Sequence, residues 1–376
     1  MNSKSWEMKR GMLQTAICGV LLLASTAFAA DLPRVVVTAD GRGFVLADSK
    51  QPFHPLGFNY GNRGRLIEDF WTNDWAAVAR DFREMKKLGA NVTRVHLQFG
   101  KFMCAPSLPN VDALAQLGKL VALANETGVY LDLTGLASYR PADVPAWYDA
   151  LDDAGRWSAQ AAFWEAIAKQ CAANPAVFCF DLMNEPISPA GPRKPGQWRS
   201  GKLLGEYDFV QLIALEPAGR KREEIAKQWI RAMTAAIRKH DGKSLITVGQ
   251  LPWVEKWGHL SGFLPAAVAP ELDFVSVHIY PEKGKVPEAL DGLKKFCVGK
   301  PVVIEETFNL ACSSEEVLQF LRESRAHACG WLGHYDGLTA ADYDALKAAG
   351  KLTLAQALWR AWLDVFQQFA PDVGRK

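Results

Sequence analysis

The sequence lacks the patterns that mark several large classes of protein. It holds seven cysteines but no Cys-x-x-Cys pair, which disfavours a zinc site. It has no Gly-x-Gly-x-x-Gly turn and no phosphate-loop lysine pattern, which disfavours an open nucleotide-binding sheet. After residue 30 no run of 18 consecutive apolar residues occurs, so we expect no membrane span there. There is also no basic block, and nothing favours nucleic acid or an anionic membrane as a partner.

The first thirty residues have the features of an export signal. A basic leader precedes an apolar segment over residues 12–28, which is shorter than the ~20 residues that a spanning helix needs. Ala27-Phe28-Ala29 then fits the small-x-small cleavage pattern. We therefore predict a cleaved signal peptide over residues 1–30 and a secreted or periplasmic protein over 31–376. Cleavage removes three basic residues and one acidic residue, so the formal charge falls from +2 to 0.

The length and rhythm of the remaining chain favour one architecture. Residues 31–376 form a longer chain than the ~250–300 residues at which a single hydrophobic core usually stops growing. An eight-fold barrel is the main kind of single domain that exceeds this length. Strand-like and helix-like patterns alternate eight times, which implies a parallel sheet with right-handed crossovers. We predict a single-domain (β/α)8 TIM barrel. An N-terminal β-hairpin, formed by Val35–Val37 and Gly43–Leu46 around an Asp-Gly turn, is expected to close its bottom.

The predicted barrel strands are short apolar runs, and several end in polar side chains. Strand C-termini in such a barrel open onto one face, where active sites lie. An isolated buried charge costs several kcal/mol, so these groups need partners. One interpretation is an ion-pair cluster that ties the rim together, but their joint position at strand ends favours an active site. The predicted strands cover residues 55–59, 91–97, 129–134, 177–184, 244–249, 274–278, 301–306 and 330–335.

Motifs at three strand ends resemble the signature of family-5 glycoside hydrolases, within the clan of retaining glycosidases. They are NEP at residues 184–186, HIYP at 278–281 and VVIEETF at 302–308. The resemblance extends from PLGFNY, which begins at Pro55, to GWLGHYDG, which begins at Gly330. It implies that Glu185 is the general acid/base and Glu306 the nucleophile. This chemistry requires no metal or organic cofactor.

The resemblance also assigns supporting roles at the same strand ends. It makes Asn184 the amide that binds the sugar 2-hydroxyl, and it makes Arg94 and Tyr280 the groups that position the nucleophile. Glu306 follows the family pattern better than Glu305 as nucleophile. Because adjacent strand residues point to opposite sides, we expect only one of the two to face the sugar. Glu305 is then expected to pair with a rim base, although it stays open as the nucleophile.

Two histidines have two interpretations each, and one tryptophan is a further candidate. His278 either hydrogen-bonds substrate or Glu185, or it is a satisfied rim residue. His96 lies on the same side of its strand as Arg94, and a ligand role and a packing role are equally open. Trp253 lies in a loop that is expected to overhang the barrel mouth, where its ring could serve as a sugar platform.

The chain departs from the family pattern in two places. Family members usually carry a histidine after the third strand, where this chain has Thr134-Gly135-Leu136. They also usually carry a tryptophan near the end of the eighth strand. Here Trp331 stands at the start of that strand, so either Trp331 or Tyr335 substitutes, or the sugar subsite is shaped differently.

We expect a monomeric retaining glycosidase whose partner is an oligo- or polysaccharide of β-1,4-mannan or β-glucan type. The Glu305-Glu306 doublet resembles the mannan-cleaving branch slightly more than the cellulose-cleaving one. Retention requires carboxyl groups ~5–5.5 Å apart, whereas inversion requires ~6.5–9.5 Å. The alternatives are an exo-acting β-glycosidase, a glycolipid-directed glycosidase, and a non-catalytic carbohydrate-binding barrel.

Overall fold

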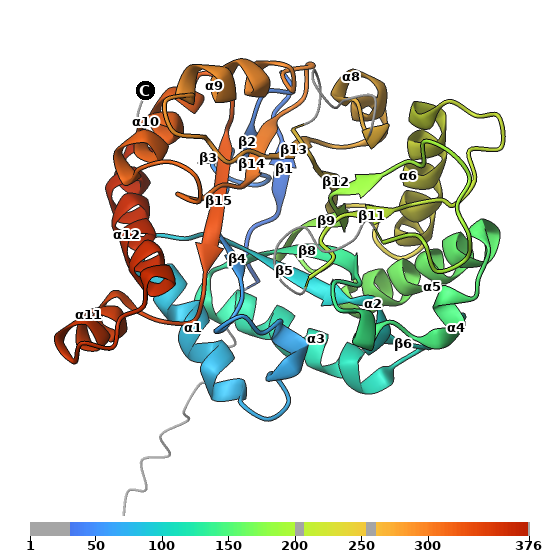
Figure 1. Ribbon diagram of the computed structural model, residues 1–376, viewed down its shortest axis with the longest axis horizontal. Helices are drawn as coiled ribbons and strands as arrows, with labels where there is room; N and C mark the ends of the chain where they lie inside the picture. Colours follow the sequence, from blue (N-terminus) through green and yellow to red (C-terminus); the bar gives the residue numbers. More distant parts are fainter. Residues whose placement is uncertain (1–30, 200–206, 253–260, 375–376) are drawn as a thin grey trace, which may run out of the picture. The chain divides into compact units, whose positions relative to one another are not determined.

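Eight parallel strands close into a barrel in the computed structural model, which describes residues 31–199, 207–252 and 261–374 (Figure 1). The ring closes where β15 pairs in parallel with β4. The predicted (β/α)8 barrel is therefore confirmed. In chain order its strands are β4 (Leu56–Tyr60), β5 (Val92–Gln98), β8 (Tyr130–Ala137), β9 (Val177–Asn184), β12 (Leu245–Gln250), β13 (Val275–His278), β14 (Val302–Glu306) and β15 (Gly330–Tyr335).

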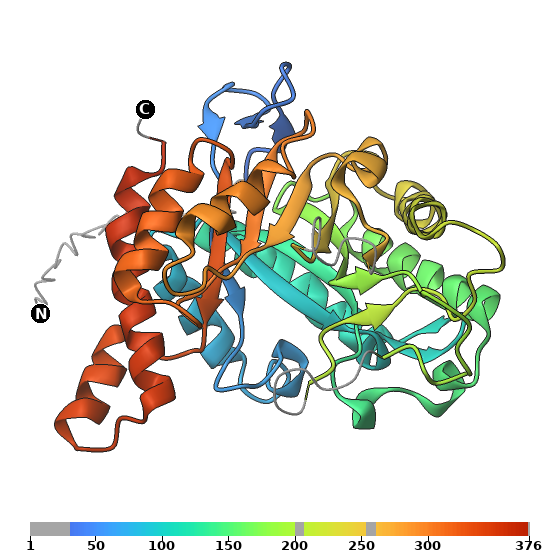
Figure 2. The ribbon, with the colours of Figure 1, turned by 45° about the horizontal axis from the view of Figure 1, so that its top comes forward.

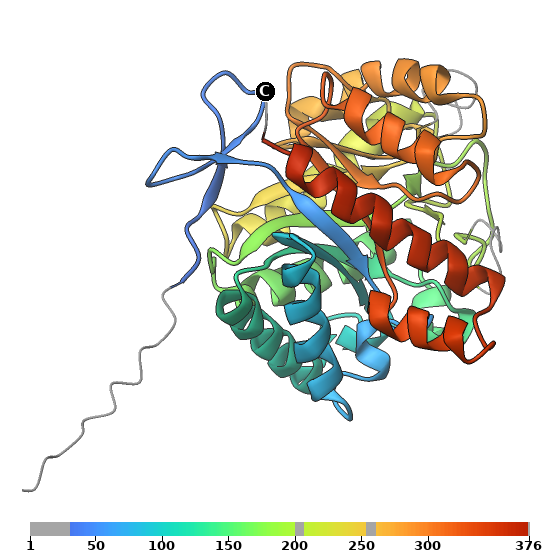
Figure 3. The same cartoon turned by 90° about the vertical axis from the view of Figure 1, so that its left-hand side faces the viewer.

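The strands are buried on both sides because one side faces the barrel interior and the other faces the surrounding helices. All eight residues of β9 are buried, for example. Helices follow the strands around the barrel, and Figure 3 shows α10 and α12 packed side by side on its outer face. These helices are α1 (Trp75–Lys87), α3 (Val111–Thr127), α5 (Asp153–Cys171), α6 (Arg222–Arg238), α9 (Val286–Lys294), α10 (Ser314–Ser324) and α12 (Leu354–Phe369).

Shorter helices and strands lie in the loops between the barrel strands and the main helices. These short elements had no predicted counterparts, and the longest of them, α11, begins with a capping box in which Thr339 and Asp342 bond reciprocally. No helix in the described ranges combines the length and the apolar character needed to cross a membrane. The short elements are η1 (Ile67–Asp69), α2 (Phe99–Phe102), β6 (Met103–Ala105), β7 (Leu108–Pro109), η2 (Pro141–Asp143), α4 (Ala146–Asp149), β10 (Pro186–Ile187), β11 (Gln211–Leu212), α8 (Pro265–Val268), η3 (Ala269–Glu271), α11 (Ala340–Ala348) and η4 (Ala370–Asp372).

The N-terminal segment covers the end of the barrel where the strands begin (Figure 2). It forms an antiparallel sheet of β1 (Val35–Val37), β2 (Phe44–Leu46) and β3 (Pro52–Phe53). The ring of Phe44 meets those of Phe178 and Phe274 edge-on, with centroids 5.3 Å apart in both cases. The predicted hairpin is therefore present with one further strand, and it leaves the opposite end of the barrel for the polar strand ends.

Candidate active site

Irregular pairing near the ends of two strands gathers polar side chains inside the barrel. Along β14, Ile304 lies opposite Val277, but Glu306 lies opposite His278, so β14 has one extra residue. Such a bulge breaks the alternation of side chains. Both glutamates of the doublet therefore reach buried groups inside the barrel. Oε2 of Glu305 lies 3.6 Å from Nη2 of Arg94 and 3.4 Å from Nε2 of His278, so Glu305 lies against bases, as expected. A similar shift lies between β9 and β12.

Arg94 lies at the centre of the cluster and is completely buried. Its Nη1 donates to an oxygen of Glu306 at 2.6 Å and to Oδ1 of Asn59 at 2.8 Å. Its Nη2 donates to Asp181 at 2.7 Å and to Oδ1 of Asn184 at 3.1 Å. A planar guanidinium with five donors can bridge acceptors from several strands at once. Arg94 thus holds β4, β9 and β14 in one arrangement near their ends.

Glu306 is held as an anion between three groups. The hydroxyl of Tyr280 donates to its Oε2 at 2.6 Å, and Arg94 binds the other oxygen. The Nδ1 of His278 lies 3.6 Å from Oε2. Burial raises the pKa of Glu306, but the positive charges of His278 and Arg94 outweigh burial and hold the pKa well below its usual range. The carboxylate is therefore ionised and directed into the mouth.

Glu185 faces Glu306 across the same mouth. Its Oε1 lies 2.9 Å from Nδ1 of His278. Its backbone has a φ of 46°, in the left-handed region that costs a side-chain-bearing residue roughly 1–2 kcal/mol. The strained turn lets β9 end at Asn184 while the next side chain turns inward. One carboxylate oxygen of Glu185, one of Glu306 and a ring nitrogen of His278 all lie within 4.8 Å of one another.

His96 takes its predicted place beside Arg94. Its Nδ1 lies 2.6 Å from the hydroxyl of Tyr139, and its Nε2 lies 3.2 Å from Oδ1 of Asn59. Burial and the charge of Arg94 hold the pKa of His96 well below its usual range, so the ring is neutral. Neither Tyr139 nor Asn59 was predicted from the sequence as a site residue. Asn59 had a signal, since it is an amide within an otherwise apolar strand.

The structure does not bring Trp331 or Tyr335 to the site, which corrects the prediction for the eighth strand. The indole of Trp331 donates to Ser324 Oγ at 2.8 Å and packs edge-on against Phe369. The ring of Tyr335 packs against Phe58, with centroids 5.7 Å apart. Alternation along β15 is the reason, because it places residues 331, 333 and 335 on the side of the helices.

The inward position near the end of β15 belongs to His334, which the sequence reasoning missed. Its Nε2 lies 2.9 Å from the hydroxyl of Tyr280, and the two rings are stacked with centroids 6.1 Å apart. Trp359 of α12 and Phe308 flank the imidazole. The same alternation that excludes Trp331 would have identified His334. Trp253 lies outside the described residues.

Two buried acids below the mouth were also missed. Asp132 on β8 and Asp181 on β9 point into the barrel, and oxygens of both lie within 4.8 Å of an oxygen of Glu305. A charged residue inside an apolar strand was the available signal for each of them. Carboxylate oxygens so arranged could hold a metal ion in principle, but Arg94 already donates to Asp181 and to Glu306. Its positive charge opposes a second cation there.

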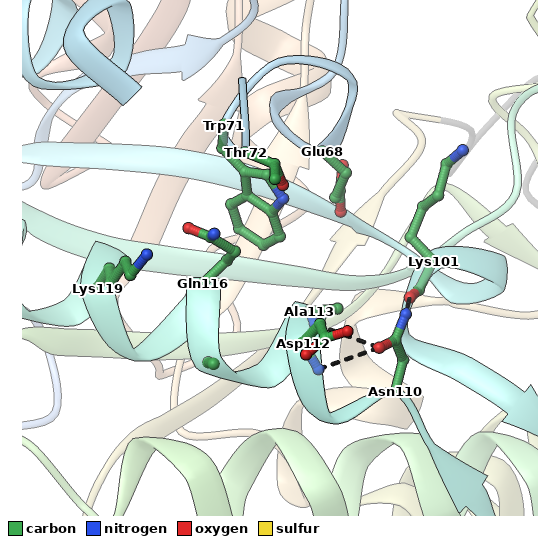
Figure 4. A pocket seen from close by; sticks show the side chains of 10 residues that line it. Glu68, Trp71, Thr72, Lys101, Asn110, Asp112, Ala113, Gln116 and Lys119 are labelled. Carbon is green, nitrogen blue, oxygen red and sulfur yellow. Dashed lines mark hydrogen bonds between the residues drawn. The ribbon is translucent and has the colours of Figure 1, made fainter. Parts of the chain in front are cut away.

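A separate hollow of about 510 Å³ lies between η1, α2 and α3 (Figure 4). Trp71, Thr72 and Gln116 are among its lining residues. Glu68 lines it too and accepts hydrogen bonds from the backbone and the side chain of Gln98, at the end of β5. Burial raises the pKa of Glu68 to about 7. The hollow shares no lining residue with the Arg94 cluster, meaning Arg94 and the four residues it donates to, which are Asn59, Asp181, Asn184 and Glu306.

The fold and the site together define a barrel enzyme with paired carboxylates at strand C-termini. A family model described as Cellulase (glycosyl hydrolase family 5) matches residues 47–337. The chain belongs to this family and is a glycoside hydrolase. Comparison with curated protein sequences gave no significant match.

Solved structures similar to this chain share its fold at low sequence identity. An exo-beta-1,4-mannosidase, Op5Man5 from Opitutaceae bacterium strain TAV5, is 18% identical with a TM-score of 0.63. That match covers 90% of this chain but 63% of the other, so the chain spans less than two thirds of that protein. A beta-mannanase from the blue mussel Mytilus edulis is 15% identical with a TM-score of 0.59, covering 90% of this chain and 96% of that one. A single-residue variant of GH5_18 from Streptomyces cattleya, solved in complex with Manb1-4GlcNAc, is 18% identical with a TM-score of 0.60, covering 86% of this chain and 82% of that one.

Proposed function

We propose that the protein is an exported retaining β-glycosidase, with Glu306 as nucleophile and Glu185 as general acid/base. The observation that carries the proposal is the approach of Glu185 and Glu306, one oxygen of each lying within 4.8 Å of the other. This proximity agrees with the ~5–5.5 Å spacing of retaining enzymes, since inverting enzymes leave ~6.5–9.5 Å for a water molecule. Export rests on the signal-like residues 1–30.

The proposed reaction has two displacement steps. In the first, an oxygen of Glu306 attacks the anomeric carbon while Glu185 gives its proton to the departing glycosidic oxygen. The bond to the aglycone breaks and an ester to Glu306 forms. In the second, Glu185 takes a proton from water as the water oxygen attacks the same carbon and the ester breaks. The sugar leaves with its original configuration, and Glu185 is protonated again.

The neighbouring groups support these steps by position and charge. Tyr280 and Arg94 direct one oxygen of Glu306 each and stabilise its negative charge before attack. Asn184 accepts from Arg94 and donates one amide proton to the carbonyl of Phe209 at 3.2 Å. Its second amide proton is the one we assign to the sugar 2-hydroxyl, a contact that strengthens as the oxocarbenium-like transition state forms.

We propose β-1,4-linked mannan as the substrate, cleaved within the chain. The support is the similarity in fold to the mussel beta-mannanase, nearly all of which this chain spans. A second candidate is terminal cleavage of β-mannosides, which the fold similarity to the exo-beta-1,4-mannosidase favours. Product analysis on manno-oligosaccharides separates the two. Internal cleavage releases a range of oligosaccharides early, whereas terminal cleavage releases only the end unit.

The first prediction concerns the two glutamates. We expect Glu306→Ala to remove hydrolysis of soluble mannan and of 2,4-dinitrophenyl β-mannoside. Glu185→Ala should lose roughly 10²–10⁴-fold on mannan, because that leaving group needs a proton. The same variant should still form the glycosyl-enzyme from the dinitrophenyl substrate, and added azide should restore turnover as a β-glycosyl azide. Rates and product configuration are read by spectrophotometry and proton NMR.

Glu68→Gln is the matched control, since Glu68 is a carboxylate near the same end of the barrel but outside the Arg94 cluster. We expect it to keep the wild-type rate. An α-configured first product would contradict retention, and full activity of Glu306→Ala would contradict the nucleophile. Absence of hydrolysis across mannans and glucans would favour the non-catalytic binding barrel.

A further inference from the structure

A line of contacts leads from Glu185 into the interior of the barrel. His278, only 1% exposed, has Nδ1 at 2.9 Å from Glu185 Oε1 and Nε2 at 3.4 Å from Glu305 Oε2. Both ring nitrogens thus face carboxyl oxygens, and Oε1 of Glu185 can accept a hydrogen bond whether or not the proton of that acid is on its other oxygen. A ring that donates to acceptors on both sides must carry a proton on each nitrogen. The geometry therefore points to an imidazolium at His278.

The far side of Glu305 has an unusual partner. Oε1 of Glu305 and Oδ1 of Asp132 are buried, and neither has a hydrogen-bond donor among the described residues. The two carboxyl groups face each other and can bond if one of them carries a proton. Burial and the charge of Glu305 raise the pKa of Asp132 well above its usual range. For Glu305, the charges of Arg94 and His278 outweigh burial and lower the pKa. The opposite directions of the two shifts favour Asp132 as the partner that carries the proton.

We propose that Glu305 is a positioning residue, which accepts a hydrogen bond from protonated Asp132 and keeps His278 doubly protonated between Glu185 and Glu306. The proposal rests on the proposed function for its catalytic meaning. Each glutamate of the doublet then has its own role, since the β14 bulge directs Glu306 at the sugar and Glu305 at His278.

A cation at His278 suits a reaction in which negative charge moves between two carboxylates. Before attack the charge is on Glu306, and after the first step it is on Glu185. His278 Nδ1 lies 2.9 Å from the nearer oxygen of Glu185 and 3.6 Å from that of Glu306. One fixed charge therefore stabilises both states, with no need for solvent to reorganise in a buried site.

Other charged and titratable groups around His278 come from several strands. Burial opposes the charged form of the ring, but Glu306, Glu185 and Glu305 together outweigh burial and raise the pKa of His278 to about 10. Burial holds the pKa of both neighbouring histidines below the usual value, so neither competes for the proton. The groups concerned are Arg94, His96, Glu185, Glu305, Glu306 and His334.

The test is histidine NMR on the full-length enzyme without substrate. In ¹⁵N-histidine-labelled protein at pH 8, we expect His278 to show two protonated ring nitrogens, assigned by their loss in His278→Asn. Glu305→Gln keeps a hydrogen-bond acceptor but removes the charge. We expect its His278 to become neutral at pH 8, and kcat to fall roughly 10-fold or more with KM nearly unchanged.

Asp132→Asn provides the second variant, because its amide donates to Glu305 as the protonated acid does. We expect the two His278 signals to persist in it, and thermal melts show which variants fold. A neutral His278 in the wild type at pH 8 overturns the proposal, as does an imidazolium that survives in Glu305→Gln or disappears in Asp132→Asn. Because the spectra need no turnover, failure of the glycosidase assignment is distinguishable from failure of this inference.

Discussion

Arg94 does more than any other single side chain to hold the site together. It is buried and donates to two carboxylates and two amide oxygens from three strands, so its loss leaves negative charges unpaired in the barrel. Breaking a buried pair by removing one partner costs far more than breaking an exposed one. The predicted positioning role of Arg94 therefore includes a structural role that the sequence pattern did not separate from it.

We expect Arg94→Met to lower the free energy of unfolding by about 3–5 kcal/mol and to abolish hydrolysis. The matched control is Arg83→Met, which removes an arginine that pairs with Glu126 while both side chains are more than half exposed. That change should cost about 0–1 kcal/mol. Urea denaturation of the two variants gives the comparison, and equal costs would contradict the central place of Arg94.

At the scale of the element, strand irregularities and close approaches shape the cluster. The β14 bulge brings Glu305 and Glu306 to the same side, and the shift between β9 and β12 lets Asp181 and Asn184 both reach Arg94. Gly249 on β12 provides the space between them. A Cβ there would lie 2.9 Å from Nη2 of Arg94 and 2.9 Å from Nε2 of His278.

We therefore expect Gly249→Ala to displace the arginine or the histidine and to lower kcat. Overpacking of this kind typically costs about 1–3 kcal/mol of stability, since the displaced side chains are held by several bonds each. Gly242→Ala is the control, because a Cβ there meets nothing within 4 Å. Melting temperatures and mannan hydrolysis are measured for both variants. A fully active Gly249→Ala would show that the cluster can accommodate a methyl group at this position.

At the scale of the whole molecule, the site couples stability to pH. The folded pKa of His278 is raised from 6.5 to about 10, so its contribution is complete below pH 6.5 and is lost as the pH rises toward 10. The folded pKa of Glu306 is lowered from 4.5, so its contribution is complete above pH 4.5 and is lost as the pH falls. The two together favour greatest stability between about pH 4.5 and 6.5.

The difference in unfolding free energy between the wild type and His278→Asn should therefore shrink as the pH rises from 6 to 9. One pKa unit corresponds to about 1.4 kcal/mol, so we expect a decrease of about 2–3 kcal/mol over this range. Urea denaturation at pH 6, 7.5 and 9 measures it. A difference that stays constant across these values would mean that His278 is neutral in the folded protein.

The sequence alone determined the barrel and identified the strand ends that carry its polar side chains. Apolar runs, helical spacing and polar strand termini are local patterns, and eight repeats of them are compatible with few topologies. Arg94, Asn184, Glu185, Tyr280 and Glu306 followed from those patterns and from the family motifs, and the structure brings them together.

Only the tertiary structure decided which neighbours complete the site. Whether Glu305 joins Glu306 depends on a bulge, and a bulge is set by the register between strands that are distant in sequence. The pairing of Asp132 with Glu305 arises because β8 and β14 face each other across the closed barrel. His334, and not Trp331, lies at the inward position near the end of β15. The register between β15 and β4 decides which residues of β15 point inward, and the sequence motif does not contain that register.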